Sequence, residues 1–529
     1  MVEQRRKRRY IPGLFVAALA ALSLGFAAWA FFTDPFGDSG MRNVFTALGV
    51  VLASLVLFSW FVVASAWSPR LRLGAALAAP CLVAAFAAAF RYEGVSGSMI
   101  PSFSWRWSEP RVLALPREGD QKRVDLTTVR ATDFPGFLGA QRDATVHGVD
   151  LARDWQARPP ELLWRKDIGK GWSGFAIVNG VAITQEQRGE RELVTAYAVQ
   201  SGDLLWSHDE DAHKTHPVGG DGPRATPLID EGRVYALGAF GVLLCLDGAD
   251  GRLLWRRDLP RDFGISPDQE ARVVDYGRSN SPLIIGKRLF CPVGGEDEAT
   301  RSGIVAFDKV SGATIWKGPS RHLSQASPQY ARLAGVDQVL VVNEASVSGH
   351  DPETGVLFWE HPWPGRTSAD PNCSQPVPVA PDSVLVSKGY GQGSALLRLV
   401  PAATGWRVEV RWASRRSLRT KFTNVVIRGD YIFGLSDGIL ECVELATGKR
   451  VWKKGRYGHG QILLVGDLLL VLSEEGELFL VEASHEAANQ VLGSMPVLEG
   501  ITWNTLALTG DLLAIRNARQ AAVYRLPLR

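Results

Sequence analysis

Two patterns of hydrophobic and polar positions divide the chain. Residues 11–32, 44–67 and 73–90 are three long stretches without a charged side chain. After residue 91, hydrophobic residues instead come in short runs separated by Gly, Asp, Asn and Pro. Long uncharged runs are typical of membrane-spanning helices, and short runs bounded by turn residues are typical of β-strands. The sequence therefore predicts membrane helices followed by an all-β domain.

The three apolar stretches are each long enough to cross a bilayer. At about 1.5 Å per residue they cover a hydrocarbon core of roughly 30 Å. The third is the shortest and contains Pro80. The first stretch alone could be a signal peptide. Its apolar run is too long for one, however, no small-residue cleavage site follows it, and two more stretches come after it. We predict three transmembrane helices over 11–32, 44–67 and 73–90.

Charged residues at the ends of these stretches predict the orientation. Residues 1–10 are strongly basic, and Arg70 and Arg72 separate the second stretch from the third. Both segments are expected in the cytoplasm, and the loop with Asp34 and Asp38 is expected outside. Three crossings then carry the rest of the chain out of the cytoplasm. In a bacterium with an outer membrane this is the periplasmic side of the cytoplasmic (inner) membrane.

The remaining chain is predicted to contain a linker and one large domain. Residues 91–132 are rich in Pro, Ser and Arg and have no clear hydrophobic period, which is typical of a linker. From residue 133 to residue 529, one pattern recurs. Its clearest copy runs from Leu243 to Trp255, as an apolar strand, an Asp-Gly-rich turn and a second strand ending in tryptophan.

The tryptophans that end these units recur at intervals of 40 to 61 residues. They are Trp164, Trp206, Trp255, Trp316, Trp359, Trp412 and Trp452. Each interval holds four short strands, which is the pattern of a β-propeller blade. A seventh unit ends near Val491 without its tryptophan, and residues 502–528 supply three strands of an eighth. We predict that residues 161–164 complete the eighth blade, because this closure removes free strand edges. The expected fold is an eight-bladed propeller of four-stranded blades.

The repeated unit resembles the pyrroloquinoline quinone (PQQ) repeat family of eight-bladed propellers, whose units carry the pattern A-x-D-x-x-T-G-x-x-x-W. The best matches run from Ala306 to Trp316 and from Glu444 to Trp452. The resemblance implies two kinds of relative. One is the quinoprotein dehydrogenases, which bind PQQ and calcium. The other is the non-enzymatic lipoprotein subunit of the outer-membrane β-barrel assembly machine.

This sequence departs from both kinds of relative. Many soluble quinoprotein alcohol dehydrogenases stack PQQ on a disulfide between adjacent cysteines, and no two cysteines are adjacent here. Membrane-bound glucose dehydrogenase also lacks that pair and also carries membrane helices before its propeller. The lipoprotein is anchored through a lipobox cysteine, and none lies near residue 20. Because a stacking disulfide is missing, the resemblance favours a binding role and keeps PQQ and calcium open as cofactors.

Charge and cysteine content exclude other functions. The net charge is +3, so nucleic acid is not expected as a partner. A disulfide between Cys291 and Cys373 is possible but does not follow from their spacing. His213 and His216 have no third ligand nearby, so no metal site is predicted.

Polar side chains line up where the first strand of each unit begins and where its second strand ends. Because the two strands are antiparallel, these positions share one mouth of the propeller channel. Glu186 and Glu344 are candidates for a general base or a calcium ligand. Trp503 lies outside the tryptophan register and is the candidate for stacking on a ring. The other candidate binding residues are Gln185, Arg188, Arg224, Lys388, Lys421, Asn424, His459, Gln461, Asn504 and Arg516.

Two functions fit this pattern. In the first, the protein is a membrane-anchored binding or scaffold module that holds another envelope component through the polar mouth or the blade edges. In the second, it is a PQQ-dependent quinoprotein oxidoreductase with its site at the same place. Polar residues at strand starts also satisfy backbone groups in propellers without ligands, and a structural Glu–Arg pair across blades is the alternative for the charged strand ends.

Overall fold

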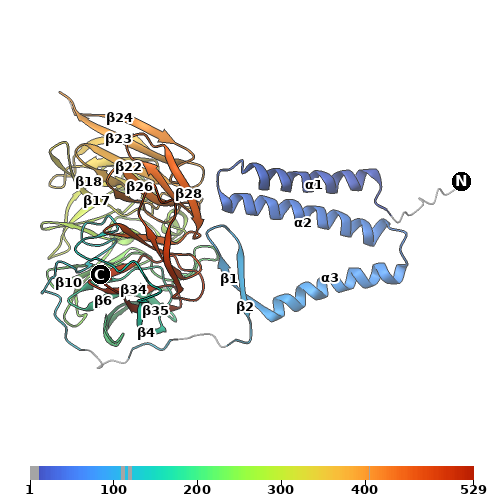
Figure 1. Cartoon of the computed structure of the whole chain (residues 1–529), viewed down its shortest axis with the longest axis horizontal. Helices are drawn as coiled ribbons and strands as arrows, with labels where there is room; N and C mark the ends of the chain where they lie inside the picture. Colours follow the sequence, from blue (N-terminus) through green and yellow to red (C-terminus); the bar gives the residue numbers. More distant parts are fainter. Residues whose placement is uncertain (1–10, 109–112, 117–121, 404) are drawn as a thin grey trace. The chain divides into compact units, whose positions relative to one another are not determined.

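The computed structural model describes residues 11–108, 113–116, 122–403 and 405–529. The basic segment 1–10, predicted to be cytoplasmic, lies outside the described residues. The chain forms two compact units, residues 1–110 and 111–529. Figure 1 shows long helices in the first unit and short strands throughout the second.

The first unit contains three helices that are each long and apolar enough to cross a membrane. They are α1 (Leu14–Thr33), α2 (Ser39–Ala64) and α3 (Pro69–Ala89). Asp38 caps α2 by accepting a bond from the Met41 N–H at 2.9 Å, and Ser68 precedes α3 with proline at its first position. Pro80 lies inside α3 and does not end it. Within the predicted linker, β1 (Phe90–Val95) pairs antiparallel with β2 (Pro101–Trp105).

The second unit is an eight-bladed propeller, so the predicted fold class is confirmed. Each blade has four antiparallel strands, and in seven of the eight blades these strands follow one another along the chain. The first four blades comprise β5 (Ala176–Val178), β6 (Val181–Arg188), β7 (Arg191–Ala198) and β8 (Leu204–Glu210); β9 (Leu228–Asp230), β10 (Arg233–Leu237), β11 (Val242–Asp247) and β12 (Leu253–Asp258); β13 (Leu283–Ile285), β14 (Arg288–Cys291), β15 (Val305–Asp308) and β16 (Thr314–Lys317); and β17 (Gln329–Leu333), β18 (Val336–Val342), β19 (Ser346–His350) and β20 (Leu357–Pro362).

The other four blades close the ring. They comprise β21 (Val377–Val379), β22 (Ser383–Lys388), β23 (Gly393–Pro401) and β24 (Trp406–Ser414); β25 (Val426–Arg428), β26 (Tyr431–Ser436), β27 (Ile439–Glu444) and β28 (Arg450–Arg456); β29 (Gln461–Val465), β30 (Leu468–Leu472), β31 (Glu477–Glu482) and β32 (Val491–Pro496); and β33 (Ala507–Thr509), β34 (Leu512–Arg516), β35 (Gln520–Arg525) and β4 (Glu161–Asp167). The outer strand of blade 8 is thus β4, from the start of the domain, as predicted. Two short helices, α4 (Leu259–Asp262) and α5 (Pro267–Val273), lie between blades 2 and 3.

The glycine and tryptophan of the repeat fit together between neighbouring blades. Gly355 has φ +77, and a Cβ added there would lie 2.5 Å from the ring of Trp316 in the preceding blade. The Trp316 indole donates to the Pro352 carbonyl at 3.2 Å. The same packing of glycine under tryptophan occurs at Gly202 on Trp164, Gly251 on Trp206, Gly312 on Trp255 and Gly448 on Trp412. The glycine and tryptophan of the repeat therefore form the contact between one blade and the next.

A segment that precedes the blades enters the channel. Phe134 pairs with Ile177 of β5, and the Arg142 guanidinium donates to the carbonyls of Ser281, Pro282 and Pro328. The strand β3 (Thr145–Val146) then adds to blade 7, parallel to β29. Residues 134–146, here called the channel segment, thus contact the innermost strands of several blades and cross the channel between them.

Candidate functional site

The predicted site residues share one face because of strand direction. In each blade the chain enters the innermost strand from the same face at which the second strand ends. We call this the mouth face. It carries the connections between blades and the loops between second and third strands. The thirteen predicted residues lie on these segments or at the strand ends that adjoin them: Gln185, Glu186, Arg188, Arg224, Glu344, Lys388, Lys421, Asn424, His459, Gln461, Trp503, Asn504 and Arg516.

The amide side chains of this set join blades. Gln185 donates to the carbonyls of Ala225 and Leu237 in blade 2, at 2.7 and 3.2 Å. Gln461 donates to the Phe422 and Trp503 carbonyls, at 3.0 and 2.9 Å. Asn504 donates to the carbonyls of Gly171 and Ser173. Asn424 accepts from the Gln375 N–H. These amides satisfy backbone groups that would otherwise be unpaired at the channel.

Glu186 and Arg188 form a buried ion pair within strand β6. The Glu186 side chain is fully buried, and Arg188 Nη2 lies 2.9 Å from its Oε1. The Tyr197 hydroxyl donates to the same oxygen at 2.7 Å, and the Gly169 N–H donates to the other. The carboxylate raises the pKa of Arg188 against the opposing effect of burial. Residues two apart on a strand face the same side, so this pair is formed within one blade and not across blades.

Two arginines of the set hold backbone carbonyls. Arg516 of blade 8 is fully buried and donates to Thr184 Oγ1 and the Gln185 carbonyl of blade 1, at 2.8 and 2.9 Å. Arg224 donates to three carbonyls of its own loop, those of Gly219, Gly220 and Gly222. Burial lowers the pKa of each guanidinium to about 10. Both side chains thus serve the fold, Arg516 by closing the ring between blades 8 and 1.

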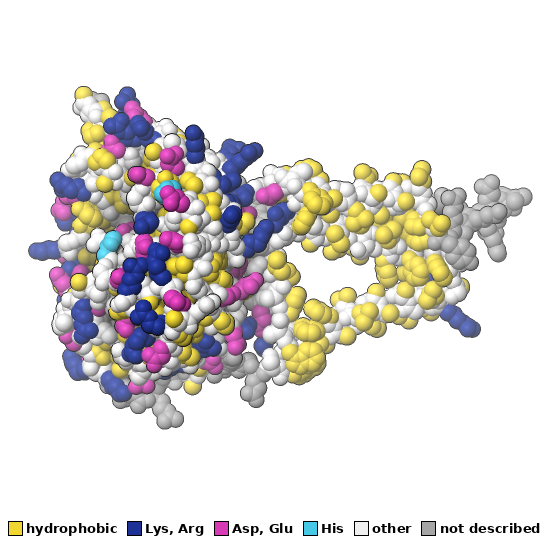
Figure 2. Space-filling view, viewed as in Figure 1, with side chains coloured by type: hydrophobic (Ala, Val, Ile, Leu, Met, Phe, Trp, Pro, Cys, Tyr) yellow, Lys and Arg dark blue, Asp and Glu magenta, His cyan; other side chains and the backbone are white. Residues whose placement is uncertain are grey.

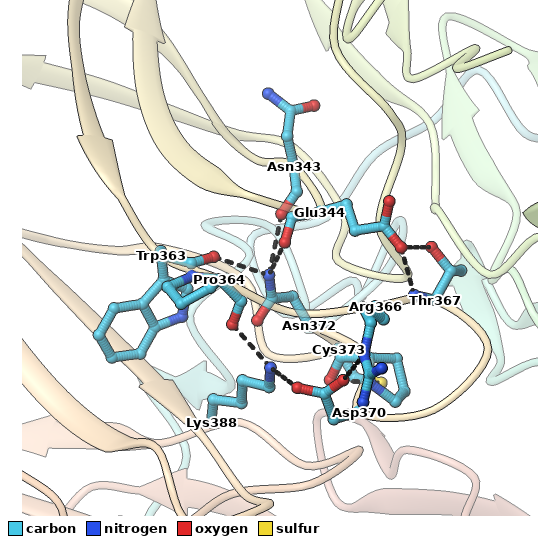
Figure 3. A network of polar contacts seen from close by, with 11 residues as sticks. Asn343, Glu344, Trp363, Pro364, Arg366, Thr367, Asp370, Asn372, Cys373 and Lys388 are labelled. Carbon is cyan, nitrogen blue, oxygen red and sulfur yellow. Dashed lines mark hydrogen bonds and ion pairs between the residues drawn. The ribbon is translucent and has the colours of Figure 1, made fainter. Parts of the chain in front are cut away.

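Glu344 and Lys388 both contact the connection between blades 4 and 5, drawn in Figure 3. Glu344 Oε1 accepts from the Thr367 N–H at 2.7 Å and from its hydroxyl at 3.1 Å. Lys388 Nζ donates to the Pro364 carbonyl at 2.8 Å and pairs with Asp370 at 3.0 Å. Burial lowers the pKa of Lys388, and Asp370 opposes the shift.

The Glu344 carboxylate is partly exposed, whereas the Lys388 side chain is 2% exposed. Figure 3 shows that the two side chains approach different parts of the loop, with Asn372 between them. Asn372 Nδ2 donates to the carbonyls of Asn343, Glu344 and Trp363. Among the described residues, no contact joins Glu344 to Glu186, so the two predicted catalytic carboxylates do not form one site.

Aromatic rings meet on the mouth face where blades 6, 7, 8 and 1 adjoin. The ring centroid of Trp503 lies 4.6 Å from that of Trp172 and 4.8 Å from that of Phe422. Phe422 in turn lies 5.5 Å from His459. Trp172, Phe422 and Trp503, here called the aromatic cluster, are all partly exposed. Sequence reasoning identified Trp503 and missed the other two, which also precede first strands.

Sequence reasoning also missed Arg142 and Glu192. Arg142 lies in the channel segment, and burial lowers its pKa to about 10. Glu192 of β7 is 7% exposed and accepts the Ala239 N–H of blade 2, at 3.1 and 3.2 Å from its two oxygens. Burial raises the pKa of Glu192 to about 7, against the Ala239 bond and Arg224. No sequence motif marks either residue.

The side chains at the mouth do not fit a calcium and quinone site. No group of three His, Cys, Asp or Glu within the described ranges could hold a metal ion. The Glu186 carboxylate already accepts from three donors. All five cysteines are free, so no disulfide joins Cys291 and Cys373. Calcium takes six to eight oxygen ligands, and Glu344 is isolated from other carboxylates among these candidates.

Curated proteins similar to this chain fall into two groups. The dehydrogenase subunit of a quinone alcohol dehydrogenase from Gluconacetobacter polyoxogenes is 23% identical over 343 residues, which cover 59% of this chain and 40% of the relative. The outer membrane protein assembly factor BamB of Shewanella oneidensis is 22% identical over 330 residues, covering 60% of this chain and 78% of the relative. The match thus spans less than half of the dehydrogenase subunit.

Solved structures show the same fold. Quinohemoprotein alcohol dehydrogenase from Comamonas testosteroni has a TM-score of 0.56 at 12% identity, covering 75% of this chain and 81% of the other. BamB from Moraxella catarrhalis has a TM-score of 0.50 at 16% identity, covering 69% and 100%. A family model described as outer membrane protein assembly factor BamB matches residues 190–454, half of the chain. The chain therefore belongs to the PQQ-repeat propeller family to which that model corresponds.

Proposed function

We propose that this protein is a membrane-anchored propeller that binds another envelope protein through its mouth face. The observation that carries the proposal is the contrast on that face between charged and aromatic side chains. Glu186, Arg188, Arg224 and Arg516 are engaged by neighbouring groups of the propeller itself. The aromatic cluster is partly exposed. A surface with accessible tryptophans and with its charges already paired suits contact with a protein more than acid–base chemistry.

The proposed location is the periplasmic side of the inner membrane. Three helices of sufficient length and hydropathy support membrane association. Arg70 and Arg72, between the second and third helices, support the orientation that leaves the propeller outside the cytoplasm. A relative named as an outer membrane assembly factor supports an envelope protein as the partner.

A quinoprotein oxidoreductase is the second candidate. The observation in its favour is the similarity to the dehydrogenase subunit of quinone alcohol dehydrogenase. In that case the partly exposed Glu344 and Trp503 are the residues of this chain that a quinone or its cation would contact.

The first experiment distinguishes these functions by ligand-dependent thermal unfolding. The purified full chain in detergent is heated with PQQ and calcium over a range of concentrations. A ligand at a hundredfold its Kd would stabilise the folded state by about 2.7 kcal/mol. We expect no change in Tm. A saturable rise that Glu344→Gln abolishes would support the oxidoreductase and contradict the binding module.

The second experiment locates the partner. A photo-crosslinking amino acid replaces Trp503 in cells, and a matched control replaces Val310, which is 54% exposed on a turn at the opposite face. We expect a crosslinked adduct of defined mass from position 503 and none from position 310. Adducts of equal yield from both positions would contradict a partner site at the aromatic cluster.

A further inference from the structure

Positive charge is concentrated on the neighbouring blades 5 and 6. Residues 406–421 and 449–456 contain eleven Lys and Arg and a single Glu, whereas the whole chain has 58 Lys and Arg against 55 Asp and Glu. These residues form β24, β28 and the connection from blade 5 to blade 6. Figure 2 shows Lys and Arg side chains gathered over the part of the propeller where Figure 1 labels these strands. The propeller of this nearly neutral protein thus has a strongly basic sector on blades 5 and 6.

Hydrogen bonds bring several of these basic groups together between the two blades. Arg450 Nη2 donates to the Arg416 carbonyl. Ser436 Oγ accepts from Lys453 Nζ at 3.1 Å and from the Arg419 N–H at 3.1 Å. Burial, together with the neighbouring Arg419 and Arg450, lowers the pKa of Lys453 to about 8 against the opposing effect of Glu441 and Asp437. Like charges are therefore held close together here.

The acidic groups nearby neutralise only part of this charge. Glu441 is fully buried and pairs with Arg450, and it also accepts the Leu418 N–H. Asp437 lies 3.7 Å from Arg419 and 3.8 Å from His459. The exposed residues Arg415, Arg416, Lys454 and Arg456 form no ion pair with any residue that the structure describes. We call Arg415, Arg416, Arg450, Lys453, Lys454 and Arg456 the basic rim.

We propose that the basic rim docks the propeller on anionic lipid headgroups of the membrane that anchors the chain. The same chain carries three helices able to span a bilayer. Residues 108–123 lie between β2 and Val124, whose N–H bonds the Ala249 carbonyl within the propeller. A segment of that length reaches at most roughly 55 Å when fully extended. Helices inserted in a bilayer would therefore tether the propeller to a lipid surface, where phosphate groups supply the anions that clustered arginines bind.

This docking uses the basic rim, whereas the envelope-protein partner proposed above would contact the aromatic cluster. Each basic residue near an anionic membrane surface raises the ratio of docked to undocked propeller by roughly fivefold. Reversing Arg415, Arg416 and Lys454 to Glu would lower that ratio on the order of a hundredfold or more. The attraction is expected to weaken as salt shortens the Debye length.

The test measures energy transfer from the propeller to the membrane. The full chain with Cys81→Ser, Cys373→Ser and Ala413→Cys carries a donor dye at position 413, beside the basic rim, in nanodiscs with headgroup-labelled acceptor lipid. The nanodiscs contain either phosphatidylcholine alone or phosphatidylcholine with 30% phosphatidylglycerol. We expect stronger transfer in the anionic nanodiscs and its loss in 0.5 M salt. Equal transfer in both lipid compositions would overturn the proposal.

A matched pair of variants separates a specific surface from general charge. The triple variant Arg415→Glu, Arg416→Glu and Lys454→Glu is expected to lose the lipid-dependent transfer. The control variant Arg261→Glu, Lys287→Glu and Lys317→Glu changes the net charge equally at exposed positions in and before blade 3 and is expected to retain it. Circular dichroism verifies that both variants are folded. Equal loss in both folded variants would contradict docking through the basic rim.

Discussion

Glu192 makes the stability of the propeller depend on pH near neutrality. This side chain, 7% exposed, lies between blades 1 and 2, where its only close hydrogen-bond donor among the described residues is the Ala239 N–H. Burial raises the pKa of Glu192 from 4.5 to about 7. In the unfolded chain the same carboxyl would ionise near 4.5. Between these two values the folded protein holds a proton that the unfolded chain has lost.

The sign and size of the effect follow from proton linkage. Because the folded pKa is raised, the contribution of Glu192 to stability is fully present below pH 4.5 and is lost as the pH rises towards and through 7. A shift of this size corresponds to about 3 kcal/mol at 1.36 kcal/mol per unit. Glu192→Gln keeps an acceptor for Ala239 and removes the ionisation. The variant should match the wild type near pH 4.5 and exceed its stability by about 3 kcal/mol at pH 8.

The assay compares thermal unfolding of the two full-length proteins in detergent at several pH values. For a domain of about 400 residues, 3 kcal/mol corresponds to about 4 °C in Tm. The Tm difference between Glu192→Gln and the wild type should therefore grow by about 4 °C from pH 4.5 to pH 8. Glu190→Gln, at a side chain 80% exposed, is the matched control and should show no such growth. A constant difference for Glu192→Gln across this range would refute the argument.

Two further predictions concern the contacts between blades. Arg516→Gln should destabilise the propeller by about 3 kcal/mol, because the carbonyls that Arg516 holds in blade 1 lose their donors. The control Arg411→Gln, at an exposed position of β24, should leave Tm nearly unchanged. Equal losses of Tm in the two variants would contradict a special role for Arg516. Gly355→Ala should lower Tm more than Gly335→Ala. Both glycines have positive φ, but only at Gly355 would the new methyl meet a tryptophan ring. Equal effects of the two alanines would show that the contact with Trp316 is unimportant.

The repeat could be recognised from the sequence because the glycine and the tryptophan of most units are only four residues apart. Gly355 precedes Trp359 within one turn and strand, and it also packs on Trp316 of the preceding blade. The same spacing in several units predicted both the number of blades and the use of residues 161–164 to close the ring. The antiparallel order of the strands likewise predicted that Glu186, Lys388 and Arg516 share one face, since each lies at or near the end of a second strand.

Contacts between distant residues decided what those side chains do. Arg516 donates to Thr184, 332 residues away, and nothing in either sequence neighbourhood indicates that pairing. Arg142 reaches the Pro328 carbonyl across 186 residues, from the channel segment that precedes the blades. The raised pKa of Glu192 needs the neighbouring blade, because desolvation arises only once the blades pack. Local pattern thus determined the architecture, whereas burial and pairing at the mouth face were decided by tertiary structure.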